Sequence, residues 1–185
     1  MRTIVDTSSL VILARYYHPF DSTENLDDHL REEIRNGSLI VLDKVLTESR
    51  HVAQGLAYNT FSCLREKKIA RDSAELTPSN RFFNMLDNNF VDRVMKRTKF
   101  AEDIAGYTNE RDKFLNSADC AMIVFAMNKN SVLDPIRILT EESVNQNDGK
   151  LFKKIPLICS ELNIPTITAV DYLKQASSLR VEVTR

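Results

Sequence analysis

The chain has 185 residues, of which 43% are hydrophobic and 28% are charged, and its formal net charge at pH 7 is −1. This length and composition are typical of one globular domain with an ordinary core, and they exclude a chain that is disordered for lack of apolar residues. A net charge near zero also excludes a molecule that attracts polyanions over its whole surface, so any such binding requires a local basic patch.

The chain opens with a strand that is followed directly by an acid. Residues 3–5 are β-branched and predict a short buried strand, and Asp6 stands at its carboxyl end. Open α/β sheets bind ligands at that end of their strands. A helix follows to about Tyr17, with Ser8 or Ser9 as its cap. The alternative is that Asp6 only caps this helix.

A second helix and a second strand come next. The stretch 21–24 is typical of a helix cap and predicts a helix that runs to Arg35 and ends at Asn36-Gly37. Residues 38–42 predict the second strand. Asp43 is expected to cap the following helix, whose apolar spacing continues to about residue 56, and Glu48 lies one turn inside it.

Residues 59–113 are predicted to form a helical insertion between strands. One helix is expected over 59–75, and another begins near Thr77-Pro78 and ends in a basic stretch at residues 96–99. No linker sets the insertion apart, so we expect one domain over residues 1–185.

The second half continues the alternation of strands and helices. Asn116 or Ser117 is expected to cap a strongly apolar helix over 120–127, with Asp119 in its first turn. The remaining predicted elements are a strand over 136–139, a helix over 155–162, a strand over 164–168 and a helix over 169–177. Such alternation predicts an α/β fold of three layers, with a parallel sheet of four to five strands between helices.

The cysteines argue against a zinc site and against a disulfide framework. The three cysteines are far apart, form no CxxC pair and share no ligand spacing with the three histidines. Cys120 and Cys159 lie in apolar runs, which predicts buried thiols in a reducing compartment. No apolar run has transmembrane length and the first strand begins at once, so we expect a cytoplasmic protein without a signal peptide or membrane contact.

Four predicted segments each place an acid at the end of a strand or at the start of a helix. These acids are Asp6, Glu48, Asp119 and Glu142. In a doubly wound sheet such positions converge on one edge, where carboxylates repel one another and their pKa values rise. A divalent cation removes this conflict, and oxygen ligands suit Mg²⁺ or Mn²⁺. Three nearby acids remain alternatives to members of this set: Asp43, Glu141 and Asp148.

The order of these segments resembles that of a PIN-domain ribonuclease, closest to the small prokaryotic proteins that include VapC-like toxins. The matching stretches are Ile4-Val5-Asp6-Thr7-Ser8, Val45-Leu46-Thr47-Glu48, Ala118-Asp119-Cys120-Ala121 and Ile138-Leu139-Thr140-Glu141-Glu142. Together they span nearly the whole chain. Two departures stand out: the last acid is Glu rather than the usual Asp, and the insertion is longer than in compact toxins.

The resemblance implies a set of catalytic residues. The metal-binding acids would be Asp6, Glu48, Asp119 and Glu142, with either Glu141 or Glu142 as the last ligand. The hydroxyls that support them would be Thr7 or Ser8, and Thr140. The implied activity is a Mg²⁺- or Mn²⁺-dependent endoribonuclease acting on single-stranded or looped RNA, with an antitoxin protein as a further partner. Separately, the apolar positions over 78–100 would suit a homodimer, for which a buried core is the alternative.

Two features of the sequence are candidates for RNA contact. The basic residues are Lys67, Lys68, Arg71, Arg93, Lys96, Arg97 and Lys99, for which a solvated helix face is the alternative. Tyr16, Tyr17 and Phe20 are candidates for base stacking, against burial or a dimer contact.

Two other functions compete with the nuclease. A PIN-like module that binds RNA or protein without cutting is the first. A different acid-and-Mg²⁺ enzyme is the second, but Ser8 stands where the common aspartyl phosphatases have a second acid, and no Gly-rich P-loop occurs.

Overall fold

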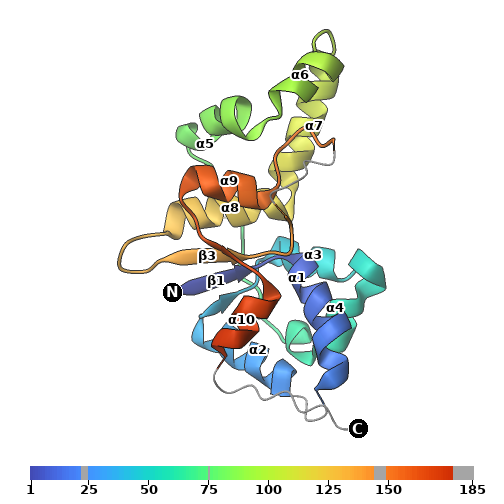
Figure 1. Ribbon diagram of the computed structural model, residues 1–185, viewed down its shortest axis with the longest axis vertical. Coiled ribbons are helices and arrows are strands. Elements are labelled where there is room, and N and C mark those ends of the chain that lie inside the picture. Colours follow the sequence, from blue (N-terminus) through green and yellow to red (C-terminus); the bar gives the residue numbers. More distant parts are fainter. Residues whose placement is uncertain (22–24, 75, 144–148, 177–185) are drawn as a thin grey trace.

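The computed structural model describes residues 1–21, 25–74, 76–143 and 149–176. Four strands form one parallel sheet in the order β2-β1-β3-β4, as expected for the α/β class (Figure 1). The strands are β1 (Arg2–Val5), β2 (Leu39–Ile40), β3 (Ile136–Leu139) and β4 (Thr166–Ile167). Of the expected cap at 21–24, Asp21 is described, and its carboxylate accepts from the N–H groups of Asn25 (3.2 Å) and Leu26 (2.7 Å). Residues 22–24, Asp148 and the end of the last predicted helix lie outside the described residues.

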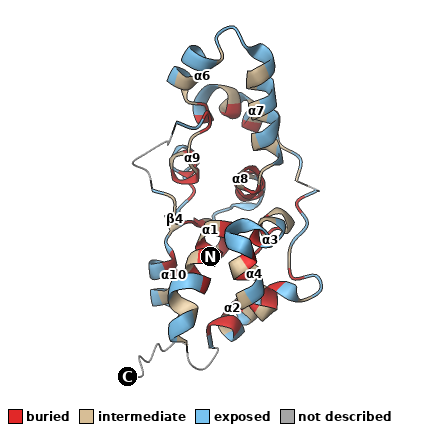
Figure 2. Cartoon of the chain, turned by 90° about the vertical axis from the view of Figure 1, so that its right-hand side faces the viewer, coloured by how far each residue is buried: buried red, intermediate tan, exposed pale blue. Residues whose placement is uncertain are grey.

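Helices cover both faces of the sheet and complete three layers. The α-helices of the described residues are α1 (Thr7–Ile12), α2 (Asn25–Asn36), α3 (Asp43–Ser49), α4 (Leu56–Thr60), α5 (Asn80–Met85), α6 (Arg93–Lys99), α7 (Ile104–Asn116), α8 (Ala118–Lys129), α9 (Ile155–Leu162) and α10 (Ala169–Gln175). Helices α8 and α9 lie on one side of the sheet, and α2, α4 and α10 lie on the other (Figures 1 and 2). Because both faces are covered, the central strand β1 is apolar at consecutive positions, and Ile4 and Val5 are fully buried.

Helix α8 is buried on several sides because it separates two hydrophobic cores (Figure 2). Met122 and Phe125 pack in the main core with the sheet. Ile123 and Val124 pack in a second core with Phe82 and other residues of the insertion and of α9. The insertion helices α5, α6 and α7 therefore rest on α8 and α9, beyond the sheet (Figure 1). The three cysteines are free and buried, as predicted for Cys120 and Cys159.

The predicted helix over 59–75 is wrong beyond Thr60, where α4 ends, and within the described part of this stretch only a 3₁₀ turn follows at Ser62–Arg65. Arg71 instead lies beside the β2 edge, where its N–H donates to the Val41 carbonyl (2.8 Å) and its carbonyl accepts from the Asp43 N–H (3.0 Å). The Asp43 carboxylate accepts from the Ser73 N–H (3.1 Å) and is not the helix cap. Backbone groups at an exposed strand edge need partners, and this tertiary pairing outweighs local helix propensity.

Helix α3 ends earlier than its apolar spacing predicts. Ala53, Gln54 and Gly55 all have positive φ, so the chain turns left-handed before α4 begins. At Gly55 a Cβ atom would lie 2.8 Å from the Arg50 carbonyl oxygen, so only glycine fits there without a shift.

The predicted helix from Pro78 is interrupted as well. A π-helical turn, Leu86–Phe90, follows α5, and Val91 then forms an antiparallel bridge with Phe152. Helix α6 begins anew with Asp92 as its cap, whose carboxylate accepts from the Met95 N–H (2.9 Å). No helix of the described residues is long and apolar enough to cross a membrane.

Candidate functional site

The strand order changes direction between β1 and β3. From β1 the chain moves to β2 on one side and later returns to β3 on the other side, so β1 and β3 flank the point where the winding reverses. Ligands of open α/β sheets bind outside the carboxyl ends of the strands at such a point. Asp6 follows β1 and Thr140 follows β3, and the Asp6 N–H donates to the Leu139 carbonyl (3.0 Å).

Asp6 is held in place by several donors. Its carboxylate accepts from the Ser8 hydroxyl (2.5 Å), from the Thr140 hydroxyl (3.0 Å) and, more weakly, from the Ser8 N–H (3.4 Å). The last contact makes Asp6, rather than Ser8 or Ser9, the cap of α1. Only 6% of the Asp6 surface is exposed. Capping of α1 therefore does not exclude a role of Asp6 in a site, because its carboxylate also lies at the carboxyl end of β1.

Glu48 reaches the same edge from α3. Its carboxylate accepts from the Thr7 hydroxyl (2.9 Å), which joins the first turn of α1 to the second turn of α3. All three predicted supporting hydroxyls thus donate to one of the predicted acids: Thr7 to Glu48, Ser8 and Thr140 to Asp6.

Asp119 lies in the first turn of α8, which is capped by the Ser117 hydroxyl accepting from the Cys120 N–H (3.1 Å). Burial, and then the negative charges of Asp6, Glu142 and Glu48, raise the pKa of Asp119 to about 7, while Lys150 opposes this rise. The four predicted acids therefore share one electrostatic neighbourhood, although they come from four separate segments.

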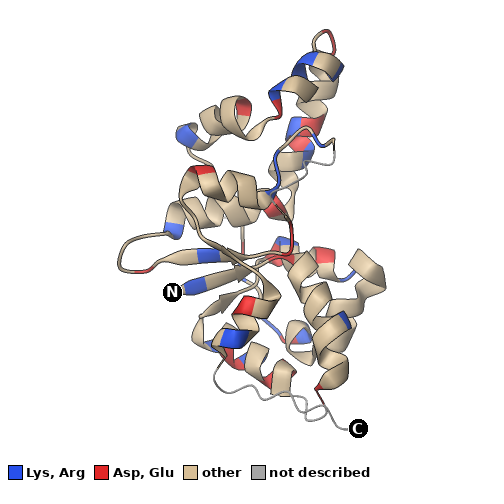
Figure 3. Ribbon diagram, viewed as in Figure 1, with Lys and Arg blue, Asp and Glu red and all other residues tan. Residues whose placement is uncertain are grey.

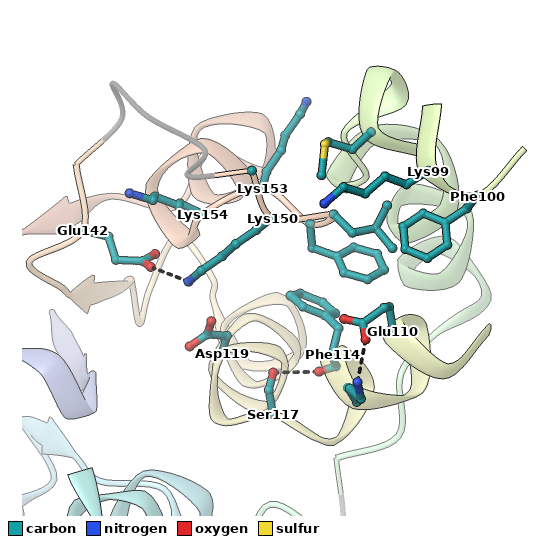
Figure 4. A pocket seen from close by; sticks show the side chains of 15 residues that line it. Lys99, Phe100, Glu110, Phe114, Ser117, Asp119, Glu142, Lys150, Lys153 and Lys154 are labelled. Carbon is teal, nitrogen blue, oxygen red and sulfur yellow. Dashed lines mark hydrogen bonds and ion pairs between the residues drawn. The ribbon is translucent and has the colours of Figure 1, made fainter. Parts of the chain in front are cut away.

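The structure distinguishes the adjacent glutamates that the sequence left open. Glu142 faces the same space as Asp119; one of its oxygens lies 3.9 Å from the Lys150 ammonium, and the other accepts from the Ile155 N–H (2.9 Å) (Figure 4). Glu141 accepts from the Ala169 N–H (2.5 Å) at the start of α10. Glu142 therefore belongs to the acidic group, whereas Glu141 serves a different helix.

The donor chemistry of this group fits Mg²⁺ or Mn²⁺, because all four side chains offer hard oxygen atoms and repel one another without a cation. The side chains are not gathered around one point, however. Across the described residues no three His, Cys, Asp or Glu side chains are arranged as a group that could hold a metal ion. Asp6, Glu48 and Glu142 are instead held by hydroxyl or N–H donors.

A cleft of about 410 Å³ opens beside Asp119 and Glu142. Lysines line it, namely Lys99, Lys113, Lys150, Lys153 and Lys154. They come from α6, α7 and the segment that leads into α9, where Figure 3 shows basic residues beside the acidic end of β3. Lys99 is the one residue of the predicted basic set that lines the cleft.

The other residues that were predicted to contact RNA do not line the cleft. Lys96 lies over the Tyr107 ring, 4.2 Å from its centroid, and Arg93 donates to the Asn88 carbonyl. Of the predicted aromatic residues, Tyr16 and Phe20 are more than half exposed. The sequence does carry a signal for the lysines that were missed, because three of them fall within five residues, 150–154.

Comparison with known proteins identifies one family. A family model described as "Domain of unknown function (DUF4411)" matches residues 4–179. No curated protein and no solved structure matches the chain.

Proposed function

The chain belongs to the DUF4411 family, and we propose that it is a PIN-like, divalent-metal-dependent endoribonuclease that hydrolyses unpaired RNA. The observation that carries this proposal is that Asp6, Glu48 and Glu142 lie close enough to Asp119 for their charges to raise its pKa, beside the switch point between β1 and β3. A site made of carboxylates, with a lysine-lined cleft beside it, suits an anionic substrate that is cut with the help of a cation.

Each acid has a role that follows from its contacts. Asp6, Asp119 and Glu142 would hold Mg²⁺ or Mn²⁺, and Thr140 fixes the orientation of Asp6 through a 3.0 Å hydrogen bond. Glu48, held by the Thr7 hydroxyl, would complete the ligand set or orient the attacking water. The bound cation would supply Lewis acidity toward the phosphoryl oxygens and offset the charge on the leaving oxygen. The reaction forms a bond between water oxygen and phosphorus and breaks one ester bond.

A binding module without catalysis is the second candidate. It is favoured by the hydrogen bonds that already engage Asp6, Glu48 and Glu142, and by the 3.9 Å approach of Lys150 to Glu142. A chain that only binds RNA has no need to gather these oxygens around a cation.

We also propose partner proteins and a cellular location for this chain. An antitoxin partner follows from the VapC-like resemblance, and a homodimer from the apolar positions over 78–100. A cytoplasmic location is proposed as well, and the free buried cysteines support a reducing compartment.

The decisive experiment compares RNA cleavage by the wild-type chain with cleavage by Asp6→Asn and Asp119→Asn. Both variants keep the size of the side chain, and asparagine still caps α1. In Mg²⁺ or Mn²⁺ we expect the wild type to cut single-stranded RNA, EDTA to stop it, and each variant to lose about 100-fold or more in rate.

The matched control is Glu102→Gln, which removes an exposed acid outside the site. Its rate should equal that of the wild type. Full activity of Asp6→Asn would refute the proposed mechanism, and RNA binding by a folded wild type without cleavage in either metal would favour the binding module.

A further inference from the structure

The lysine-lined cleft begins at Asp119 and Glu142 and continues between the insertion and the segment before α9 (Figure 4). We propose that it binds an unpaired stretch of the RNA strand. The phosphates would contact its lysines, and a base would stack on the aromatic rings of its lining. The inference rests on the proposed function for the identity of the acidic site to which the cleft leads.

The distribution of charge supports a polyanionic occupant. Lys99 and Lys113 stand on the insertion side, and Lys150, Lys153 and Lys154 stand on the opposite side. Five lysines around one cleft form a local basic patch on a chain whose formal net charge is −1.

The acids in the cleft are unevenly placed. Two of the three, Asp119 and Glu142, belong to the acidic site, and the third, Glu110, pairs with Lys113 (2.5 Å). Lys153 in turn pairs with Glu161, which is not part of the cleft lining (2.6 Å). The lysines of the lining still outnumber its acids by five to three, so a strand lying along them would place a phosphate beside the carboxylates at one end.

Aromatic rings form the other component of the cleft. Phe114 and Phe152 are stacked with their centroids 4.6 Å apart, and the half-buried Phe100 packs edge-on against Tyr107. Phe152 is buried, whereas Phe100 and Phe114 are partly exposed. Lysines beside partly exposed aromatic rings are typical of proteins that bind single strands, because phosphates contact the cations while unpaired bases stack on the rings.

The size of the cleft argues against a duplex. Its volume of about 410 Å³ falls among sites for small organic ligands, which is the scale of a base with its sugar. In A-form duplexes the bases are stacked and paired, so their faces cannot reach Phe100 or Phe114. The cleft thus selects unpaired RNA, and the substrate must extend from the scissile bond toward the insertion.

The test measures RNA binding in EDTA, where no cleavage interferes. A fluorescent single strand of roughly 12 nucleotides, within the site sizes of single-strand binders, is compared with a duplex of equal length. The variant is Lys99→Gln/Lys154→Gln, with one change on each side of the cleft. The control is Lys129→Gln/Lys174→Gln, which removes the same charge from exposed residues that do not line the cleft.

We expect the cleft variant to bind the single strand about 10- to 30-fold more weakly near 0.1 M salt, with the salt slope reduced by about 1.4. The control should stay within about twofold of the wild type, because each change there removes only long-range attraction. A second variant, Phe100→Leu, should weaken binding by about tenfold without changing the salt slope, because it removes a stacking surface rather than a charge.

Three results would overturn the proposal: no RNA binding by the wild type, equal weakening in both lysine pairs, or equal affinity for the duplex. The readout is also independent of the proposed activity. Binding as predicted with no cleavage in Mg²⁺ or Mn²⁺ would refute the nuclease but retain the cleft. Metal-dependent cleavage that is insensitive to both lysine pairs would refute the cleft but retain the nuclease.

Discussion

At the scale of single residues, three of the four acids of the candidate site carry a structural contact as well as a proposed chemical role. Asp6 caps α1, and Glu142 accepts from the N–H of Ile155 at the start of α9. These contacts hold the carboxylates near one another despite their mutual repulsion. Burial and the charges of the acidic neighbours raise the pKa of Asp119, so the ionised form of this residue destabilises the folded chain.

Replacing Asp119 by asparagine should therefore stabilise the metal-free protein at high pH. The folded-state pKa of Asp119, about 7, lies above the ordinary value of 3.8, so the folded chain binds more protons between these values and its stability falls as pH rises through them. Near pH 8 we expect Asp119→Asn to exceed the wild type by about 2 kcal/mol, roughly half the full linkage value, because the carboxyl keeps some contact with solvent.

Urea unfolding in EDTA at about pH 4 and about pH 8 measures this difference. The advantage of Asp119→Asn should largely vanish near pH 4, because the carboxyl is then protonated in the folded chain and close to its ordinary pKa of 3.8 in the unfolded chain. Glu102→Gln should show no such pH dependence. An equal advantage at both pH values would mean that Asp119 does not share a site with other charged acids.

At the scale of elements, α8 joins the two parts of the molecule. Ala118 and Met122 contact the main core, and Cys120 and Ile123 contact the second core, so the same helix supports the sheet and the insertion. The sequence predicted the apolar run of this helix. Because the run is apolar on several sides, the sequence did not indicate which other elements pack against each side.

A substitution in the second core should therefore destabilise the whole chain. Ile123 is fully buried, and Ile123→Ala should cost about 2–5 kcal/mol through lost burial and a residual cavity. Lys129→Ala, at the exposed end of the same helix, should change stability by less than about 0.5 kcal/mol. Thermal unfolding followed by circular dichroism and by calorimetry should show one shifted transition. Two separate transitions would show that the insertion is an independent domain.

At the scale of the whole molecule, the fold brings acids and lysines to adjacent parts of one surface. The acidic group lies at the carboxyl edge of the sheet, and the cleft continues from it toward α6 and α7 (Figures 3 and 4). The proposed metal ion would add a favourable interaction that exists only in the folded chain, because the four acids are scattered in the unfolded one.

Binding of the cation should therefore raise the thermal midpoint. Saturation to about 100 times the dissociation constant stabilises a protein by about 2.7 kcal/mol, which corresponds to roughly 5–10 °C for a chain of this size. Differential scanning calorimetry with Mn²⁺ or Mg²⁺ should show this rise for the wild type and for Glu102→Gln, and a much smaller rise for Asp119→Asn. A midpoint that neither cation changes would count against the proposed metal site.

The sequence by itself determined the four strands, the fold class and most helix starts. Strand and helix signals act over a few neighbouring residues, so a buried strand at β1 or a serine cap at Ser117 can be recognised locally. The four acids were selected for the same reason, since each stands next to such a signal.

Only the tertiary structure decided which distant residues contact these strands, helix starts and acids. The choice of Glu142 over Glu141, the pairing of Arg71 with the β2 edge and the lysine-lined cleft all depend on residues from separate segments. Each reflects a backbone or charged group that finds its partner far away in the chain, and such a partner leaves no trace in local periodicity.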